Sequence, residues 1–166
     1  MRLTGLNELD DDAATRELLR CCGSTRWAQR MKAARPFRDA ASVTEGADAI
    51  WWSLEPADWL EAFAAHPKIG EAATTAWSAE EQAGVAVAGG DVRRRLAAAN
   101  RDYEARFGYI FIVCATGKSA ADMLAALERR LGHAPEQELR IAAEEQQKIT
   151  RLRLARLLDA DGASNG

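Results

Sequence analysis

The hydrophobic positions of this chain recur mostly at the three- and four-residue spacing that is typical of amphipathic helices. Alanine and leucine dominate, β-branched residues are sparse, and residues that start or stop helices follow one another. We therefore expect an all-α fold, a single-domain bundle of about eight helices. The expected helices start near residues 7, 24, 42, 56, 78, 91, 119 and 135, and the last one reaches about residue 158.

Several of these starts carry side chains that can cap the exposed N–H groups of a first helical turn. Ser24, Asp91 and Ser119 stand where N-cap residues are favoured. The run Ser42–Glu45 has the spacing of a capping box. Pro56 suits the first turn of a helix over residues 56–65. We expect the first helix to run unbroken over about residues 7–22.

One segment, YIFIVCA at residues 109–115, interrupts the helical pattern with a continuous apolar run of strand length. No comparable second run is present for it to pair with, so we expect a short buried extended segment rather than a sheet. No linker or repeat divides the chain. We expect one helical domain over residues 1–158 and a disordered tail over residues 159–166.

His66, one of only two histidines, stands where the helix predicted over residues 56–65 ends. Pro67 disfavours the α conformation at the residue before it, which places His66 just past the helix. Histidine titrates near neutral pH and is suited to proton transfer. Two interpretations stay open: a surface histidine that favours the helix C-terminus, or a histidine that faces a cleft. His133, in the turn after Gly132, is interpreted as structural.

The long last helix carries polar residues where its apolar face should be. At about 100° per residue, Leu139, Ala142, Ala143, Ile149, Leu154 and Leu157 share one arc. Gln146 and Arg153 project into that arc. A buried arginine is paired, extends its charged end to solvent, or binds an anion, and the helical geometry alone leaves these alternatives open.

The run Ser78-x-x-Glu81-Gln82 also has two interpretations. Ser at the N-cap with Glu at the third helical position explains it structurally. A helix N-terminus also offers N–H groups to an anionic or carbonyl-rich ligand. The three cysteines have no metal-ligand or disulfide spacing, and the two histidines lie far apart, so we expect reduced thiols and no metal site.

Composition narrows the classes of partner. The net charge of −3 argues against nucleic acid, and the basic cluster Arg93–Arg95 is interpreted as a solvated helix face. No apolar run approaches the length of a membrane span, and the N-terminus has acids where a signal peptide is apolar. The chain does not end in the peroxisomal Ser-Lys-Leu. We therefore expect a cytoplasmic protein with no membrane or nucleic-acid partner.

Five stretches occur in one order: CCGSTRWAQRM with RPF at 21–37, WLEAFAAHPKIG at 59–70, SAEEQAG at 78–84, NRDYEARFGYIFIVCA at 100–115, and KITRLRLARLL at 148–158. Over about residues 9–158 the chain resembles the 2-oxo-4-hydroxy-4-carboxy-5-ureidoimidazoline (OHCU) decarboxylase family of uric acid degradation. The resemblance implies an all-helical, cofactor-independent homodimer that converts the small molecule OHCU to (S)-allantoin and CO2.

The resemblance also implies roles for individual residues. His66 and Glu81 match the family's catalytic residues. The positions that match its substrate contacts are Pro67, Ser78, Gln82, Phe111, Ile112, Val113, Cys114, Ala115 and Arg153. Arg153 is therefore singled out twice: by its position on the apolar face of the last helix, and by its match to the family's substrate-binding arginine.

One departure concerns the loop between His66 and Ser78, which is shorter here than in animal members of the family. Three alternatives to the decarboxylase stay open. They are a non-catalytic helical interaction domain built around the five tryptophans, a related enzyme that acts on another ureide or hydroxy acid, and a metal-dependent hydrolase.

Overall fold

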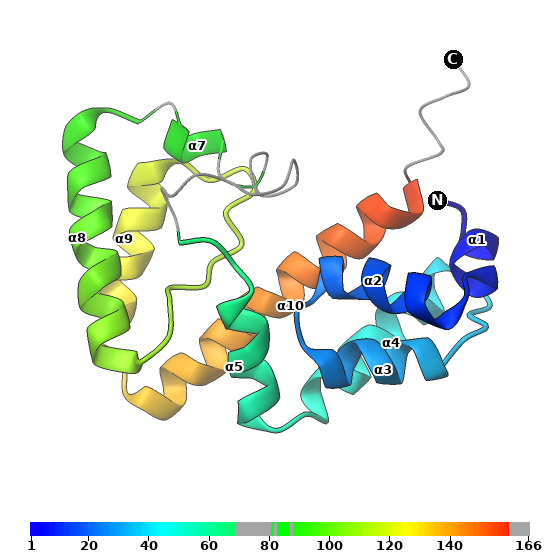
Figure 1. The fold of residues 1–166 in the computed structure, drawn as a ribbon. Coiled ribbons are helices and arrows are strands. Elements are labelled where there is room, and N and C mark those ends of the chain that lie inside the picture. Colours follow the sequence, from blue (N-terminus) through cyan, green and yellow to red (C-terminus); the bar gives the residue numbers. More distant parts are fainter. Residues whose placement is uncertain (69–80, 82, 87, 160–166) are drawn as a thin grey trace, which may run out of the picture. The chain divides into compact units, whose positions relative to one another are not determined.

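The computed structural model describes residues 1–68, 81, 83–86 and 88–159. These residues form nine helices and no strand, which confirms the all-α prediction (Figure 1). The chain divides into two compact units. Unit 1 contains Met1–Ala62 and the chain from Gln147 onward, and unit 2 contains Phe63–Gln146. The single domain expected over residues 1–158 stays a prediction. Of the tail expected over 159–166, all but the first residue lies outside the described part.

Unit 1 contains the N-terminal helices, with α2 packed on α3 and α3 on α4. Their bounds are α1 Leu3–Glu8, α2 Asp11–Cys21, α3 Thr25–Ala33, α4 Ala40–Trp52 and α5 Pro56–Ala64, whose last two residues begin unit 2. The second half of α10, Pro135–Asp159, completes the unit. Leu18, Trp27, Met31 and Val43 are fully buried in its core, as are both adjacent cysteines.

The prediction of one helix over residues 7–22 was wrong. The chain forms α1 and α2 instead, and Leu9 between them leaves the helical conformation with ψ 141°. The Asp10 side chain accepts the Ala13 N–H at 2.8 Å and so caps α2. Asp is among the best N-cap residues, and here it starts a new helix rather than continuing the old one.

Two predicted helix starts were displaced by a few residues. The N-cap of α4 is Asp39, and Ser42 is the third helical residue, its side chain accepting the Asp39 N–H in a capping box. The N-cap of α8 is Gly89 rather than Asp91. In both places two candidate caps lie within one turn, so local sequence does not decide between them. The predicted Ser24 and Ser119 caps are confirmed.

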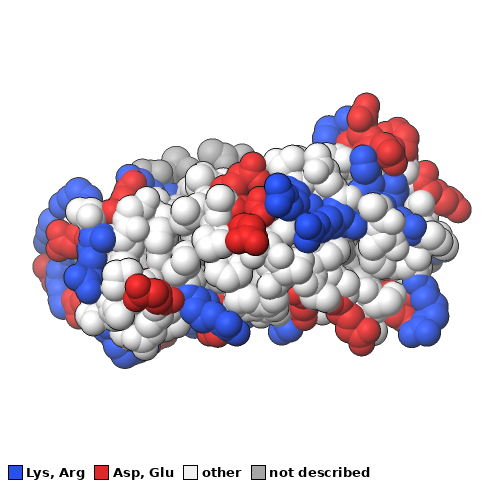
Figure 2. All heavy atoms as spheres, turned by 90° about the horizontal axis from the view of Figure 1, so that it is seen from below, with Lys and Arg blue, Asp and Glu red and all other residues white. Residues whose placement is uncertain are grey.

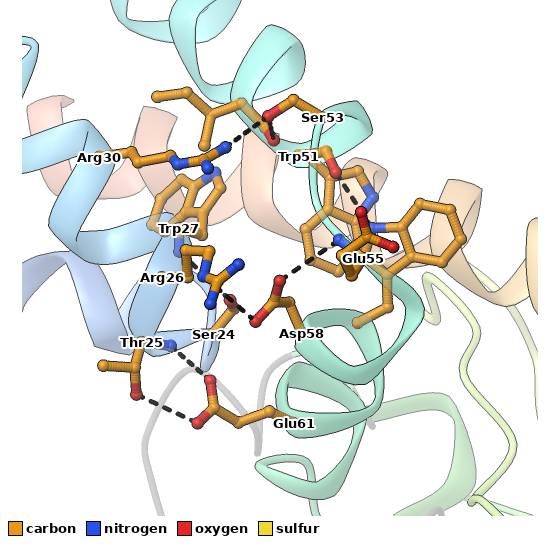
Figure 3. Close-up of polar contacts among 12 residues, drawn as sticks. Ser24, Thr25, Arg26, Trp27, Arg30, Trp51, Ser53, Glu55, Asp58 and Glu61 are labelled. Carbon is orange, nitrogen blue, oxygen red and sulfur yellow. Dashed lines mark hydrogen bonds and ion pairs between the residues drawn. The ribbon is translucent and has the colours of Figure 1, made fainter.

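Polar side chains of α5 contact the start of α3 (Figure 3). The Ser24 Oγ accepts the Trp27 N–H, and the Glu61 carboxylate accepts the Thr25 N–H at 2.5 Å and its hydroxyl at 3.1 Å. Trp59 donates its indole N–H to the Trp51 carbonyl at 3.0 Å. A carboxylate at a helix N-terminus satisfies free N–H groups and complements the helix dipole. These contacts hold α5, the helix that leads to His66.

Unit 2 has a core of its own, built on α8 and α9, which pack side by side (Figure 1). Its helices are α7 Ala83–Ala86, α8 Gly90–Phe107, α9 Ala120–Arg130 and the first half of α10. Gly108 ends α8 in the left-handed region, with φ 83°, which glycine adopts without strain. The rings of Tyr103 and Phe111 lie 5.4 Å apart in this core.

The predicted extended segment is confirmed in position and burial. Residues 110–115 are not helical, and Phe111, Ile112, Val113 and Ala115 are buried while Cys114 is half-buried. A continuous apolar run fits a segment that is covered on both sides. Its backbone polar groups therefore need partners inside the protein.

Charged side chains of both signs lie on the surface (Figure 2), in keeping with the small net charge of −3. Arg93, Arg94 and Arg95 are exposed, as expected of a solvated helix face. Figure 2 shows Lys and Arg side chains interspersed with Asp and Glu over the face that it presents. Among the described residues, no helix combines the length and the apolar character needed to cross a membrane.

Candidate functional site

His66 lies just past the end of α5, as the proline after it predicted. The helix ends at Ala64, and the His66 N–H donates to the Phe63 carbonyl at 3.2 Å in a last tight turn. His66 and Pro67 are both half-buried. The end of a packed helix thus holds the backbone of His66 in place. The residue is only half-buried, so its imidazole ring stays accessible to solvent or to a ligand.

The imidazole of His66 contacts the amide of Gln146 on α10. The distance from His66 Nε2 to Gln146 Oε1 is 2.6 Å, within unit 2 and across 80 positions of sequence. The Gln146 side chain is fully buried. One of the two polar residues on the predicted apolar arc therefore faces the candidate catalytic histidine.

Glu81 is half-buried and helical, two residues before α7. Ser78 and Gln82, the other members of the Ser-x-x-Glu-Gln run, lie outside the described residues. Gly84 brings α7 close to the loop after the extended segment, because a Cβ at Gly84 would collide with the Lys118 carbonyl oxygen. The glycine in SAEEQAG is therefore a packing requirement that positions the chain carrying Glu81.

The extended segment is held through its backbone on two sides. The Ile112 carbonyl accepts Arg130 Nη1 at 2.7 Å, and the Cys114 N–H donates to Glu145 Oε1 at 3.3 Å. Glu145 is buried. Side chains of α9 and α10 thus fix the peptide groups of the segment for which the family resemblance implies substrate contact.

Arg130 belongs to a buried cluster around the Glu138 carboxylate. Glu138 Oε1 accepts the Tyr103 hydroxyl at 2.5 Å and Arg130 Nε at 2.7 Å, while Oε2 lies 3.0 Å from His133 Nδ1. Burial, together with the hydrogen bond to Glu138, raises the pKa of Tyr103 well above its ordinary value. The Arg130 guanidinium also lies 4.5 Å from the Phe111 ring centre. His133 thus contacts a buried carboxylate, which is consistent with the structural interpretation of this residue.

Arg153 lies in unit 1, in the second half of α10. It is half-buried, and its Nη1 donates to the Arg20 carbonyl at 3.2 Å, in the last turn of α2. A guanidinium there complements the partial negative charge of a helix C-terminus. The alternative that Arg153 is paired is confirmed for one of its N–H groups, and its role in holding an anion stays a prediction.

The cysteines behave as core groups. Cys21 and Cys22 are buried and form no disulfide among the described residues, and Cys114 is half-buried. Burial raises the pKa of the Cys21 and Cys22 thiols to about 12. Among the described residues, no group of three or more His, Cys, Asp or Glu side chains is arranged to hold a metal ion.

Unit 2 therefore contains His66, Pro67, Glu81 and the segment Phe111–Ala115, while Arg153 belongs to unit 1. The sequence-based prediction did not assign a role to Gln146 or to the residues that hold the extended segment, Arg130 and Glu145. The sequence did contain a signal for Gln146, because a polar residue on an apolar helix face needs a hydrogen-bonding partner. For Arg130 and Glu145 a single sequence contains no comparable signal.

Comparison with known proteins identifies relatives. A family model described as OHCU decarboxylase matches residues 7–155. The uric acid degradation bifunctional protein TTL of Arabidopsis thaliana is 38% identical over 146 residues, covering 82% of this chain and 45% of that protein. The OHCU decarboxylase of Haloferax volcanii is 31% identical over 165 residues, covering 93% of this chain and 95% of that protein. The chain thus spans under half of the plant relative and nearly all of the Haloferax one.

Solved structures agree with these relatives. One described as OHCU decarboxylase in the presence of (S)-allantoin aligns with a TM-score of 0.80 and 38% identity, covering 91% of this chain and 99% of that one. One described as (S)-allantoin synthase aligns with a TM-score of 0.70 at 22% identity, a likeness of fold alone. Since the family model spans most of the sequence, this chain belongs to the OHCU decarboxylase family.

Proposed function

We propose that this protein is a cofactor-independent carboxy-lyase of uric acid degradation that converts OHCU to (S)-allantoin and CO2. The observation that carries the proposal is the TM-score of 0.80 at 38% identity to an OHCU decarboxylase crystallised in the presence of (S)-allantoin. The match covers 91% of this chain. The proposal is also supported by His66, the half-buried histidine held at the end of α5. Its imidazole is suited to proton transfer near neutral pH.

The substrate carries the electron sink that the reaction needs. The carbon that loses CO2 also bears the hydroxyl group and adjoins a ring C=N bond. When the C–C bond breaks, its electron pair forms a C=C bond with the neighbouring carbon, and the imine pair moves to nitrogen, which takes a proton. The resulting enol loses its hydroxyl proton and is protonated at the neighbouring carbon. Protonation on one face gives the S configuration, and the net change is loss of CO2 and gain of one proton.

The proposed residue roles follow from this chemistry. His66 exchanges a proton with the hydroxyl group or with the intermediate. Glu81 orients His66 or accepts ureido N–H groups, and Gln82 also binds the ureido group. Arg153 clamps a substrate anion or carbonyl with its planar fork of donors.

The remaining matched positions hold and orient the substrate. Pro67 fixes the backbone beside His66, Ser78 stands at the proposed helix N-terminus, and backbone groups of Phe111–Ala115 contact ring carbonyls. The contacts of Arg130 and Glu145 support that last role, because they fix the peptide groups of the segment before a ligand arrives.

The direct test supplies freshly generated OHCU and follows allantoin formation by circular dichroism. Uncatalysed protonation occurs on both faces and gives no net signal, so the enzyme is expected to produce a dichroic product faster than the spontaneous decay. His66→Ala should abolish this signal. A rate equal to the spontaneous decay would favour a non-catalytic interaction domain, and turnover of a different ureide alone would favour a related enzyme.

We also propose that the protein acts as a cytoplasmic homodimer, as the family resemblance implies. Light scattering coupled to size-exclusion chromatography should give twice the mass of the 18.1 kDa chain. A monomer at micromolar concentration would contradict this part of the proposal without touching the proposed reaction.

A further inference from the structure

Gln146 is a polar side chain in a setting that otherwise excludes polar groups. It is fully buried on the arc of α10 that also carries Ala142, Ala143 and Ile149, all of them buried. Leaving a buried amide unsatisfied costs about 1–3 kcal/mol. An apolar residue of similar length, such as methionine, would serve packing alone. Packing alone therefore does not explain an amide at this position, and its hydrogen bonds must.

The contact in question is the hydrogen bond to His66. Gln146 Oε1 lies 2.6 Å from His66 Nε2, and the imidazole is only half-buried while the amide is fully buried. A carbonyl oxygen only accepts hydrogen bonds, so this geometry selects the tautomer that carries its proton on Nε2. We propose that Gln146 is the positioning residue of His66, holding the ring's orientation and directing proton exchange with the substrate to Nδ1.

A neutral partner differs in effect from the carboxylate that often orients a histidine. A carboxylate at the same place would favour the charged imidazolium and raise the pKa of the histidine. The adjacent residue on α10, Glu145, is a carboxylate, and it accepts the Cys114 N–H and lies 3.8 Å from Lys118 Nζ. Lys68, two residues after His66, pairs with Glu104 of α8 at 2.8 Å. At His66 Nε2 the oxygen of Gln146 belongs to a neutral amide, so this contact fixes the tautomer without adding a charge.

This inference rests on the proposed proton-transfer role of His66, but its first test does not require turnover. The chain has two histidines, so ¹⁵N-edited NMR can resolve both rings, with His66→Ala identifying the His66 signals. In the neutral wild-type ring we expect a protonated Nε2 and an unprotonated Nδ1. In Gln146→Met this preference should weaken to the modest Nε2–H preference of a free histidine side chain. A wild-type ring protonated on Nδ1, or a preference unchanged in Gln146→Met, would overturn the inference.

The second test is kinetic and uses three variants. Gln146→Met should lower kcat on the order of a hundredfold with KM little changed, because a misoriented group loses transition-state interactions rather than binding. Gln146→Glu keeps an acceptor oxygen, so it should restore the Nε2–H tautomer and raise the pKa of His66. Gln147→Met, at the next and half-buried position of α10, controls for the loss of an amide and should match the wild type.

The outcomes separate the two proposals. If wild-type protein does not accelerate OHCU decay, the proposed function fails, and the NMR comparison still decides whether Gln146 sets the His66 tautomer. If the wild type turns over OHCU and Gln146→Met matches it in kcat, the proposed function stands and Gln146 is not a positioning residue. If Gln146→Met does not fold, Gln146→Glu carries the test: a wild-type pKa of His66 in this variant would overturn the inference.

Discussion

Replacing Glu138 with leucine should destabilise the protein far more than an ordinary loss of an ion pair. The Glu138 side chain is fully buried, and Arg130 beside it keeps only 6% of its side-chain surface exposed. Glu138→Leu leaves the Arg130 charge and the Tyr103 hydroxyl in the core without their acceptor. Removing one partner of a buried ion pair costs about 3–5 kcal/mol, so we expect a loss of that size.

A double variant separates the stranded charge from the rest of the effect. In Arg130→Met with Glu138→Leu neither charge of this pair remains in the core, so the double variant should be more stable than Glu138→Leu alone. It should still fall below the wild type, because Arg130 Nη1 also donates to the Ile112 carbonyl. An unsatisfied buried carbonyl costs about 1–3 kcal/mol.

Urea unfolding followed by far-ultraviolet circular dichroism measures these free energies of unfolding. The exposed pair Arg95 and Glu128, 3.0 Å apart with 56% and 49% of the side chains accessible, gives the matched control. Glu128→Ala should cost less than about 1 kcal/mol. If Glu138→Leu also costs less than 1 kcal/mol, or if the double variant loses the sum of the two single losses, the argument from a stranded charge is refuted.

Four further predictions concern the site and the thiols. Gly84→Ala should lower kcat/KM on the order of a hundredfold because its Cβ displaces α7, whereas Gly89→Ala, where a Cβ meets open space, should not; equal activity would contradict the packing argument. Because burial raises the pKa of Cys21 and Cys22 to about 12, Ellman's reagent at pH 8 should titrate only the third cysteine in the folded protein. The two buried thiols favour the folded state in their neutral form. Their contribution to the free energy of unfolding is therefore unchanged below the unfolded pKa near 9 and should fall as the pH rises toward 12. A free energy of unfolding that increases over this pH range would contradict the prediction. Arg153→Lys should raise KM about tenfold with a smaller change in kcat, since a point charge replaces a planar fork; unchanged kinetics would remove Arg153 from the site.

Local rules accounted for most helix ends because those ends depend on a few neighbouring residues. Ser24, Ser119 and Pro135 begin or cap helices as predicted. The rules failed where two candidates compete within one turn, as Asp39 and Ser42 do. Caps of similar strength differ by a few tenths of a kcal/mol, so tertiary packing decides which one is used.

The candidate site divides in the same way. His66 was placed just past α5 from the proline that follows it, and Gln146 was recognised as a misplaced polar residue on α10. That these two side chains contact each other did not follow, since 80 positions separate them. The buried network that holds the extended segment was also hidden, because Arg130 and Glu138 look like ordinary surface charges in a helical sequence.

The sequence by itself determined what depends on local spacing: the helical class, most helix boundaries, the buried extended segment, and the order of motifs that marks the family. Only the tertiary structure decided which buried polar groups satisfy one another. Periodicity reports which face of a helix is covered, but it carries no information about what covers it. For Gln146 the sequence indicated that a hydrogen-bonding partner was needed, and the tertiary structure shows that the imidazole of His66 is such a partner.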